Sequence, residues 1–109
     1  MNLVIIESPY AGDVAANVNY ARLCMRDSLN RGESPLASHL LYTQPGILDD
    51  DIPSERQLGI DAGLAWRKAA QFSVFYVDLG WSRGMLAAKE IYEREGFPFE
   101  IRALNEAAA

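Results

Sequence analysis

The sequence predicts an α/β protein with a parallel sheet of four to five strands and helices on both faces. The apolar run Leu3–Ile6 is continuous rather than alternating, as is typical of a strand that is buried on both faces. A second run, Phe72–Val77, is rich in aromatic and β-branched residues, which favour strands. Segments with helical spacing of apolar residues separate the strand-like runs, giving the order βαβαβαβ. This order favours right-handed parallel crossovers.

The first unit is a strand, a loop and a helix. The strand at residues 3–6 ends in a turn-rich segment, residues 8–12. Asp13 occupies the position of a helix N-cap, and apolar residues then recur every three or four positions as far as Leu29. Gly32 is the expected C-terminal glycine.

The second unit starts with a shorter strand, predicted over residues 34–41, with Pro35 at its entry. A polar connection follows, and Pro53 is placed as in the first turn of a helix. Gly59 and Gly63 lower the helix propensity of the segment after Pro53 but permit close packing.

The third unit begins with the strand at residues 72–77, which stops at Asp78. A loop at residues 79–84 leads into a helix from about Met85 to Glu95, which Gly96 closes. Residues 97–101 predict a last, edge-type strand. We therefore expect one domain over residues 1–104 and a frayed tail over residues 105–109.

The composition excludes several classes of protein. The chain has 109 residues and a formal net charge of -5, which argues against binding an extended nucleic acid. No apolar run is long enough to span a membrane, and the first residues do not resemble a signal peptide. The one cysteine, Cys24, cannot form an internal disulfide. We expect a cytoplasmic protein that does not bind membranes.

Ligands of parallel α/β sheets bind beyond the carboxyl ends of the strands. This rule points to the loops at residues 8–13, 39–51 and 78–84. In the last of these, Ser82, Arg83 and Gly84 enter a helix whose first N–H groups are unpaired, so they could form a cradle for phosphate or carboxylate. The simpler alternative is that Ser82 only caps the helix and Arg83 is solvated.

Cofactor and metal motifs are missing. The loop after the first strand has neither a Walker ending nor the Gly-x-Gly-x-x-Gly pattern, so we expect no nucleotide cofactor. His39 is the single histidine, which excludes a His-rich metal site; it is either a buried imidazole or a ligand contact at a strand end. Consecutive loop carboxylates such as Asp49–Asp51 more often stay solvated or cap the next helix than bind a metal ion, so we expect no metal.

Five segments of the chain form a recognisable combination. They are, in order, Ile5–Tyr10 with Gly12 and Asp13, Asn17, Pro35–Leu41, Glu55–Gly59 and Gly80–Met85. Together they resemble the short phage and bacterial nucleoside 2-deoxyribosyltransferase-like proteins. The similarity spans nearly the whole chain and implies a flavodoxin/Rossmann-like fold, usually oligomeric. Such a protein binds a nucleoside or nucleotide and cleaves or exchanges its N-glycosidic bond.

The resemblance also reveals a missing carboxylate. Glycosidic cleavage needs a carboxylate beneath the anomeric carbon. The relatives place a glutamate four residues past the glycine that corresponds to Gly84, and here that position is Ala88. Glu90 lies about 200° further around the helix and should not replace it. Three explanations remain. The chain is a natural binding protein without catalysis, it is an enzyme in which the glutamate was deliberately replaced, or the alignment with the relatives is shifted at this position.

The resemblance implies the roles of individual residues. Ala88 marks the catalytic position, and Asp78 either binds a sugar hydroxyl or only ends its strand. The implied binding residues are Ser8, Pro9, Tyr10, Asp13, His39, Gly80, Trp81, Ser82, Arg83, Gly84 and Met85. One alternative is a phage-encoded protein that sequesters a nucleotide without turnover. Another is a structural protein that acts through oligomer contacts.

Overall fold

The computed structural model describes residues 1–104, and the tail predicted to fray lies outside them. The chain forms an α/β fold, as the sequence predicts. Its elements are, in order, β1 (Leu3–Glu7), α1 (Val14–Asn30), β2 (Ser34–Leu36), α2 (Ser38–Leu41), α3 (Pro53–Ala65), a short 3-10 helix η1 (Trp66–Lys68), β3 (Phe72–Tyr76), α4 (Arg83–Glu95) and β4 (Phe99–Arg102).

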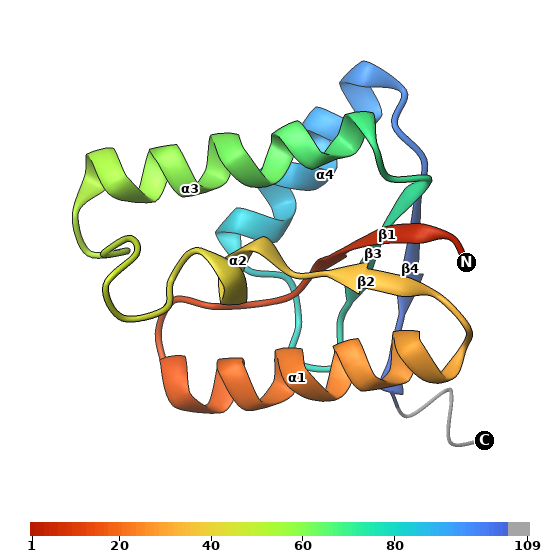
Figure 1. Cartoon of the computed structure of the whole chain (residues 1–109), viewed down its shortest axis with the longest axis horizontal. Coiled ribbons are helices and arrows are strands. Elements are labelled where there is room, and N and C mark those ends of the chain that lie inside the picture. Colours follow the sequence, from red (N-terminus) through yellow and green to blue (C-terminus); the bar gives the residue numbers. More distant parts are fainter. Residues whose placement is uncertain (105–109) are drawn as a thin grey trace.

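The described strands form one sheet of four strands in the order β2-β1-β3-β4, and every neighbouring pair is parallel. Helix α1 covers one face of this sheet, and α3 and α4 lie on the opposite side (Figure 1). The strand order is that of flavodoxin-like folds, in which the direction of winding reverses between β1 and β3. The carboxyl ends of these two central strands therefore define the crevice.

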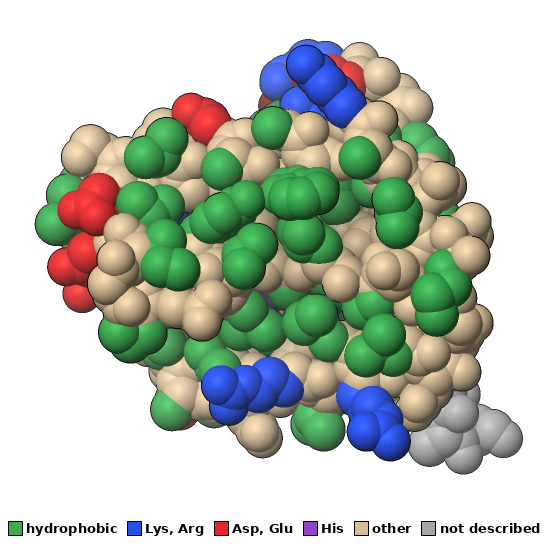
Figure 2. All heavy atoms as spheres, viewed as in Figure 1, with side chains coloured by type: hydrophobic (Ala, Val, Ile, Leu, Met, Phe, Trp, Pro, Cys, Tyr) green, Lys and Arg blue, Asp and Glu red, His purple; other side chains and the backbone are tan. Residues whose placement is uncertain are grey.

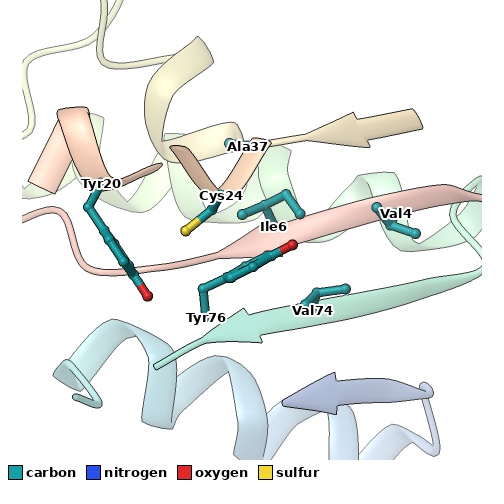
Figure 3. Packing of buried hydrophobic residues seen from close by; sticks show 7 residues of the cluster. All are labelled: Val4, Ile6, Tyr20, Cys24, Ala37, Val74 and Tyr76. Carbon is teal, nitrogen blue, oxygen red and sulfur yellow. The ribbon is translucent and has the colours of Figure 1, made fainter. Parts of the chain in front are cut away.

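Alternate residues of the central strands supply two separate cores. On the α1 face, Val74 and Tyr76 of β3 join Val4, Ile6, Tyr20 and Cys24 in one buried cluster, and Figure 3 shows Tyr20 and Cys24 beside these strand residues. On the other face, Phe75 packs with Met85, Ala88 and Tyr92 of α4. The continuous apolar run Leu3–Ile6 of the sequence reflects this burial on both faces.

Two predicted helix ends are confirmed. The Asp13 side chain accepts a hydrogen bond from the backbone N–H of Ala16 and caps α1. At the end of α4, Gly96 adopts a left-handed conformation with φ of 70°, which costs glycine little and ends the helix. These ends fix the lengths of the helices that cover the sheet.

The strand predicted over residues 34–41 is wrong in its second half. Only Ser34–Leu36 pair with β1, and Ser38–Leu41 form the short helix α2. Helix α2 packs against α3, where a Cβ atom on Gly63 would lie 2.5 Å from Ser38 Oγ. Glycine at position 63 thus permits the close approach of α2, and this tertiary contact outweighs the weak local preference of the segment.

A buried ion pair ties β4 to the turn before β2. The Arg102 guanidinium donates through Nη1 and Nη2 to the two carboxylate oxygens of Glu33, at 2.7 and 2.6 Å. Ser28 Oγ also donates to Glu33, and Arg102 lies near the Tyr76 hydroxyl. Both charged side chains are almost fully buried. Arg102 also donates to the exposed Glu100 carboxylate at 2.9 Å, so Glu33 is the member of the buried pair that depends more on its partner.

No helix within residues 1–104 is long and apolar enough to cross a membrane.

Replacing Arg102 with methionine is expected to lower the free energy of unfolding by about 3 to 5 kcal/mol, because the buried Glu33 carboxylate loses its partner. Urea unfolding measures the loss. The matched control is Lys89→Met, which removes the more exposed Lys89–Glu93 pair of α4 and should cost less than about 1 kcal/mol. Equal losses in both variants would contradict the buried ion pair.

Candidate functional site

A cavity of about 500 Å³ opens at the carboxyl ends of β1 and β3, and residues of α3 and α4 form its walls. This is the crevice expected for the fold, and its volume is typical of small-molecule sites. Eight of the predicted site residues line it, contributed by three separate segments. They are Ser8, Tyr10, His39, Ser82, Arg83, Gly84, Met85 and Ala88.

The loop after β1 is held in place by Asn17 of α1. Its side-chain amide donates to the carbonyl oxygens of Tyr10 and Ala11, at 2.9 and 3.1 Å. This contact positions Tyr10 at the cavity. Pro9 and Asp13, which the sequence also nominates, do not line the cavity; Pro9 is buried and Asp13 caps α1, so both shape the loop instead.

Ser8 and His39 meet at the floor of the cavity. Ser8 Oγ and His39 Nε2 lie 2.7 Å apart and share a hydrogen bond. Burial lowers the pKa of His39 to about 4, so the imidazole is neutral near pH 7. The sequence places His39 at a strand end, whereas the structure places it in α2, and it still faces the cavity.

The loop before α4 brings Ser82, Arg83 and Gly84 to the cavity. Ser82 Oγ accepts a hydrogen bond from the Met85 N–H at 3.2 Å, so Ser82 both caps the helix and lines the cavity. The two alternatives raised by the sequence for this residue are therefore compatible. The first turn of α4 adds its partial positive charge to the Arg83 guanidinium.

Gly80 and Trp81 do not line the cavity. Gly80 takes a positive φ of 87° in the turn after β3. Trp81 packs its ring on Phe75, with ring centroids 4.9 Å apart. Both residues direct the chain into α4 and so position Ser82.

Ala88 lies on the face of α4 that looks into the cavity. Its side chain is 8% exposed, and it lines the same cavity as Ser82 and Tyr10. The methyl group leaves the wall apolar at the position where the resemblance expects a glutamate.

Asp78 lies outside the cavity lining. One of its oxygens, Oδ1, accepts hydrogen bonds from the Tyr20 hydroxyl at 2.5 Å and from the Leu104 N–H at 2.8 Å. These bonds join the end of β3 to α1 and to the segment after β4. Of the two roles suggested by the sequence, ending the strand is the one that this geometry supports.

Glu7 is the most important cavity residue that sequence reasoning did not nominate. It lines the cavity at the end of β1, and its Oε1 accepts a hydrogen bond from the Tyr92 hydroxyl at 2.8 Å. Burial raises the pKa of Glu7 to about 7, although the bond from Tyr92 partly opposes this rise. The sequence did contain a signal for this residue. Glu7 is a charged residue at the end of an apolar strand, and ligands are expected at that edge of the sheet.

The remaining wall combines apolar and charged side chains. Ile60 and Leu64 of α3 and Ala87 and Ile91 of α4 line the cavity. Glu55 and Arg56 also line it, as do Tyr42, Thr43 and Asp50. Arg56 Nη1 pairs with Asp50 Oδ2 at 2.8 Å, whereas Arg83 forms no ion pair with any of residues 1–104.

Side chains of the acidic triplet, Asp49–Asp51, form a hydrogen bond and an ion pair within the chain. The Asp49 side chain accepts from the Asp51 N–H at 3.0 Å, and Asp50 pairs with Arg56. Among the residues that the structure describes, no group of three or more histidine, cysteine or acidic side chains is arranged to hold a metal ion.

The fold and the cavity together define a small α/β protein with a pocket at the ends of its central parallel strands. The chain belongs to the family described as "Domain of unknown function (DUF7768)", whose model matches residues 2–102. Searches of curated proteins and of solved structures found no significant match.

Glu7 and His39 are expected to change stability with pH in opposite directions. Folded Glu7 keeps its proton up to about pH 7, whereas the ordinary carboxyl loses it near 4.5, so Glu7 weakens the fold as the pH rises between these values. Folded His39 resists protonation down to about pH 4, against an ordinary pKa of 6.5, so it weakens the fold as the pH falls through this range.

Relative to the wild type, Glu7→Gln should therefore gain up to about 3 kcal/mol in free energy of unfolding as the pH rises from 4.5 to 7. The control, His39→Gln, should show a relative gain of similar size as the pH falls from 6.5 to 4. Urea unfolding over this pH range measures both. If the difference in free energy of unfolding from the wild type changed with pH in the same way in both variants, Glu7 and His39 would not be the groups that titrate.

Proposed function

We propose that the cavity binds a nucleoside or nucleotide, and that this chain, with Ala88 in place of glutamate, holds its ligand without cleaving it. An active parent with glutamate at this position would cleave or transfer the N-glycosidic bond. The observation that carries the proposal is the meeting of Ala88, Ser82 and Tyr10 at one cavity. The resemblance implies that residue 88 lies at the anomeric carbon, that Ser82 holds the sugar or phosphate end, and that Tyr10 lines the base and sugar.

The chemistry of the walls supports this assignment. A nucleotide has an anionic end, a polar sugar and a flat base. Arg83 and the first turn of α4 provide positive charge for the anionic end. Ser8 and His39 provide uncharged hydrogen-bonding groups, and Tyr10 with the apolar side chains of α3 and α4 can enclose a ring.

The position of residue 88 also fits glycosidic chemistry in an active parent. A carboxylate there would project from α4 into the cavity, where it could attack C1′ or stabilise an oxocarbenium ion. The neighbouring walls are apolar, so such a carboxylate would be shielded from water. The alanine removes the nucleophile while leaving the surrounding binding groups in place.

Replacing Ala88 with glutamate is expected to produce glycosidic cleavage of a nucleoside or nucleotide, at a rate about 10²-fold or more above that of the unmodified chain. Release of free base, separated by chromatography, measures the reaction. Ala87→Glu is the matched control, because it adds the same charge to the cavity wall about 100° around the helix. If neither variant cleaves any nucleoside or nucleotide, the active-parent proposal loses its basis.

Replacing Ser82 with alanine is expected to weaken binding of a nucleoside 5′-monophosphate by about tenfold while changing the affinity for the free nucleoside much less. Calorimetric titration measures both affinities. Asp13→Ala is the matched control, because it removes the cap of α1 at a residue that does not line the cavity. Equal losses for both ligands in Ser82→Ala would show that Ser82 does not contact phosphate.

We also propose that the chain forms a homo-oligomer, as the resemblance implies. Hydrophobic side chains gather over the middle of the face in Figure 2, and acidic ones gather near the start of α3. Large exposed apolar residues on α3 and α4 are Leu58, Ile60 and Leu86. Light scattering on the purified chain at micromolar concentration should give a mass of at least two chains; a monomer would contradict the proposal.

A further inference from the structure

Glu7 has one carboxyl oxygen fixed by the protein and one available to a ligand. Oε1 accepts the hydrogen bond from Tyr92, whereas Oε2 makes no hydrogen bond to any of residues 1–104. The residue lines the cavity, and its strand position places its side chain on the side of the sheet that α4 covers, like Ile5 two residues earlier. Oε2 is not among the buried polar side-chain atoms that lack a partner in residues 1–104, so it is accessible from the cavity that Glu7 lines.

The neighbours of Glu7 come from several elements. Tyr92, which binds its carboxyl, lies one turn of α4 beyond Ala88, so the two residues share one helix face. Ser8 and His39, which share a hydrogen bond, line the same cavity. The charged or titratable groups around it are Tyr92 and Arg83 from α4, His39 from α2, Glu55 and Arg56 from α3, Asp50 from the preceding loop, and Arg67 from η1, which acts on Tyr92.

We propose that Glu7 recognises the base of the ligand as a neutral carboxylic acid, donating a hydrogen bond from Oε2 to an acceptor atom on an uncharged nucleobase edge while Tyr92 holds Oε1. This inference rests on the proposed nucleoside or nucleotide ligand and names the side chain that recognises its base.

A neutral acid suits this environment better than a carboxylate. No cationic side chain pairs with Glu7 among residues 1–104, and burial raises its pKa to about 7. A ligand that covers the cavity removes more water and favours the uncharged form further. A neutral acid presents a donor beside an acceptor, and nucleobase edges carry the complementary pair, such as a ring nitrogen beside an amino group. The Oε2–H group can donate to the ring nitrogen, and Oε1, which has a second lone pair beside the one that Tyr92 uses, can accept from the amino group. Neither hydrogen bond buries a charge.

Glutamine is the decisive replacement, because its amide presents the same donor and acceptor without a titrating proton. The probes are the 5′-monophosphates of adenosine, cytidine, guanosine and uridine, titrated calorimetrically into the wild type and Glu7→Gln from pH 6 to 8.5. For each nucleotide that binds, we expect the wild type and Glu7→Gln to have affinities within about threefold of each other at pH 6. Above pH 7 the wild type should lose affinity relative to Glu7→Gln by about tenfold per pH unit.

The ratio of the two affinities cancels the titration of the phosphate and of His39, because both proteins share these groups. Glu7→Met, which keeps the bulk but not the polar atoms, should bind at least about fivefold more weakly than Glu7→Gln at pH 6. A ratio that does not change with pH, or a loss of more than tenfold in Glu7→Gln at pH 6, would overturn the assignment of a neutral acid to Glu7.

Failure of the proposed function has a different signature. If none of the four nucleotides binds the wild type, the ligand class is wrong, and this inference fails with it. If nucleotides bind but the affinity ratio is flat, only the role of Glu7 is wrong. Should Glu7→Gln fail to fold, carboxyl carbon NMR of the wild type gives the answer: a bound ligand must raise the pKa of Glu7, and a lowered pKa would overturn the proposal.

Discussion

Parallel pairing of the two central strands is the constraint on which the rest of the structure depends. β1 lies between β2 and β3, and β3 lies between β1 and β4, so both central strands need cover on two faces. Helix α1 covers one face, and α4 with α3 covers the other. Because the chain leaves β1 and β3 at the same edge, both loops and the start of α4 must meet there. The cavity is a consequence of this topology.

The same topology sets the electrostatics of the cavity. Its floor lies at the end of a buried strand, so the two titratable groups placed there, Glu7 and His39, are both driven toward their neutral forms near pH 7. Positive charge remains at the entrance to α4, where Arg83 is located. A ligand with an uncharged ring and an anionic end would match this separation of neutral and positive surface better than a uniformly charged ligand.

The relation between Ala88 and Glu7 connects the two proposals. Ala88 and Tyr92 share a face of α4, and Tyr92 binds Glu7, so a glutamate at position 88 would place a second carboxyl in the same apolar region. Two neighbouring acids at low dielectric resist ionising together, and one of them keeps its proton. A neutral Glu7 would then leave the charge on residue 88, as a nucleophile requires. If both proposals hold, a single substitution on α4 would separate binding from catalysis.

The sequence by itself determined the order of elements, the burial of the strands at residues 3–6 and 72–77, and the loops at which a site would form. Apolar runs, caps and prolines are local signals, and they act before the chain packs. The tertiary structure alone decided that residues 38–41 are helical, because Gly63 admits Ser38 there. It also decided the surroundings of the Glu7 carboxyl: burial, which only folding produces, raises its pKa, and the Tyr92 hydroxyl, 85 positions away along the chain, binds Oε1 and partly opposes this rise.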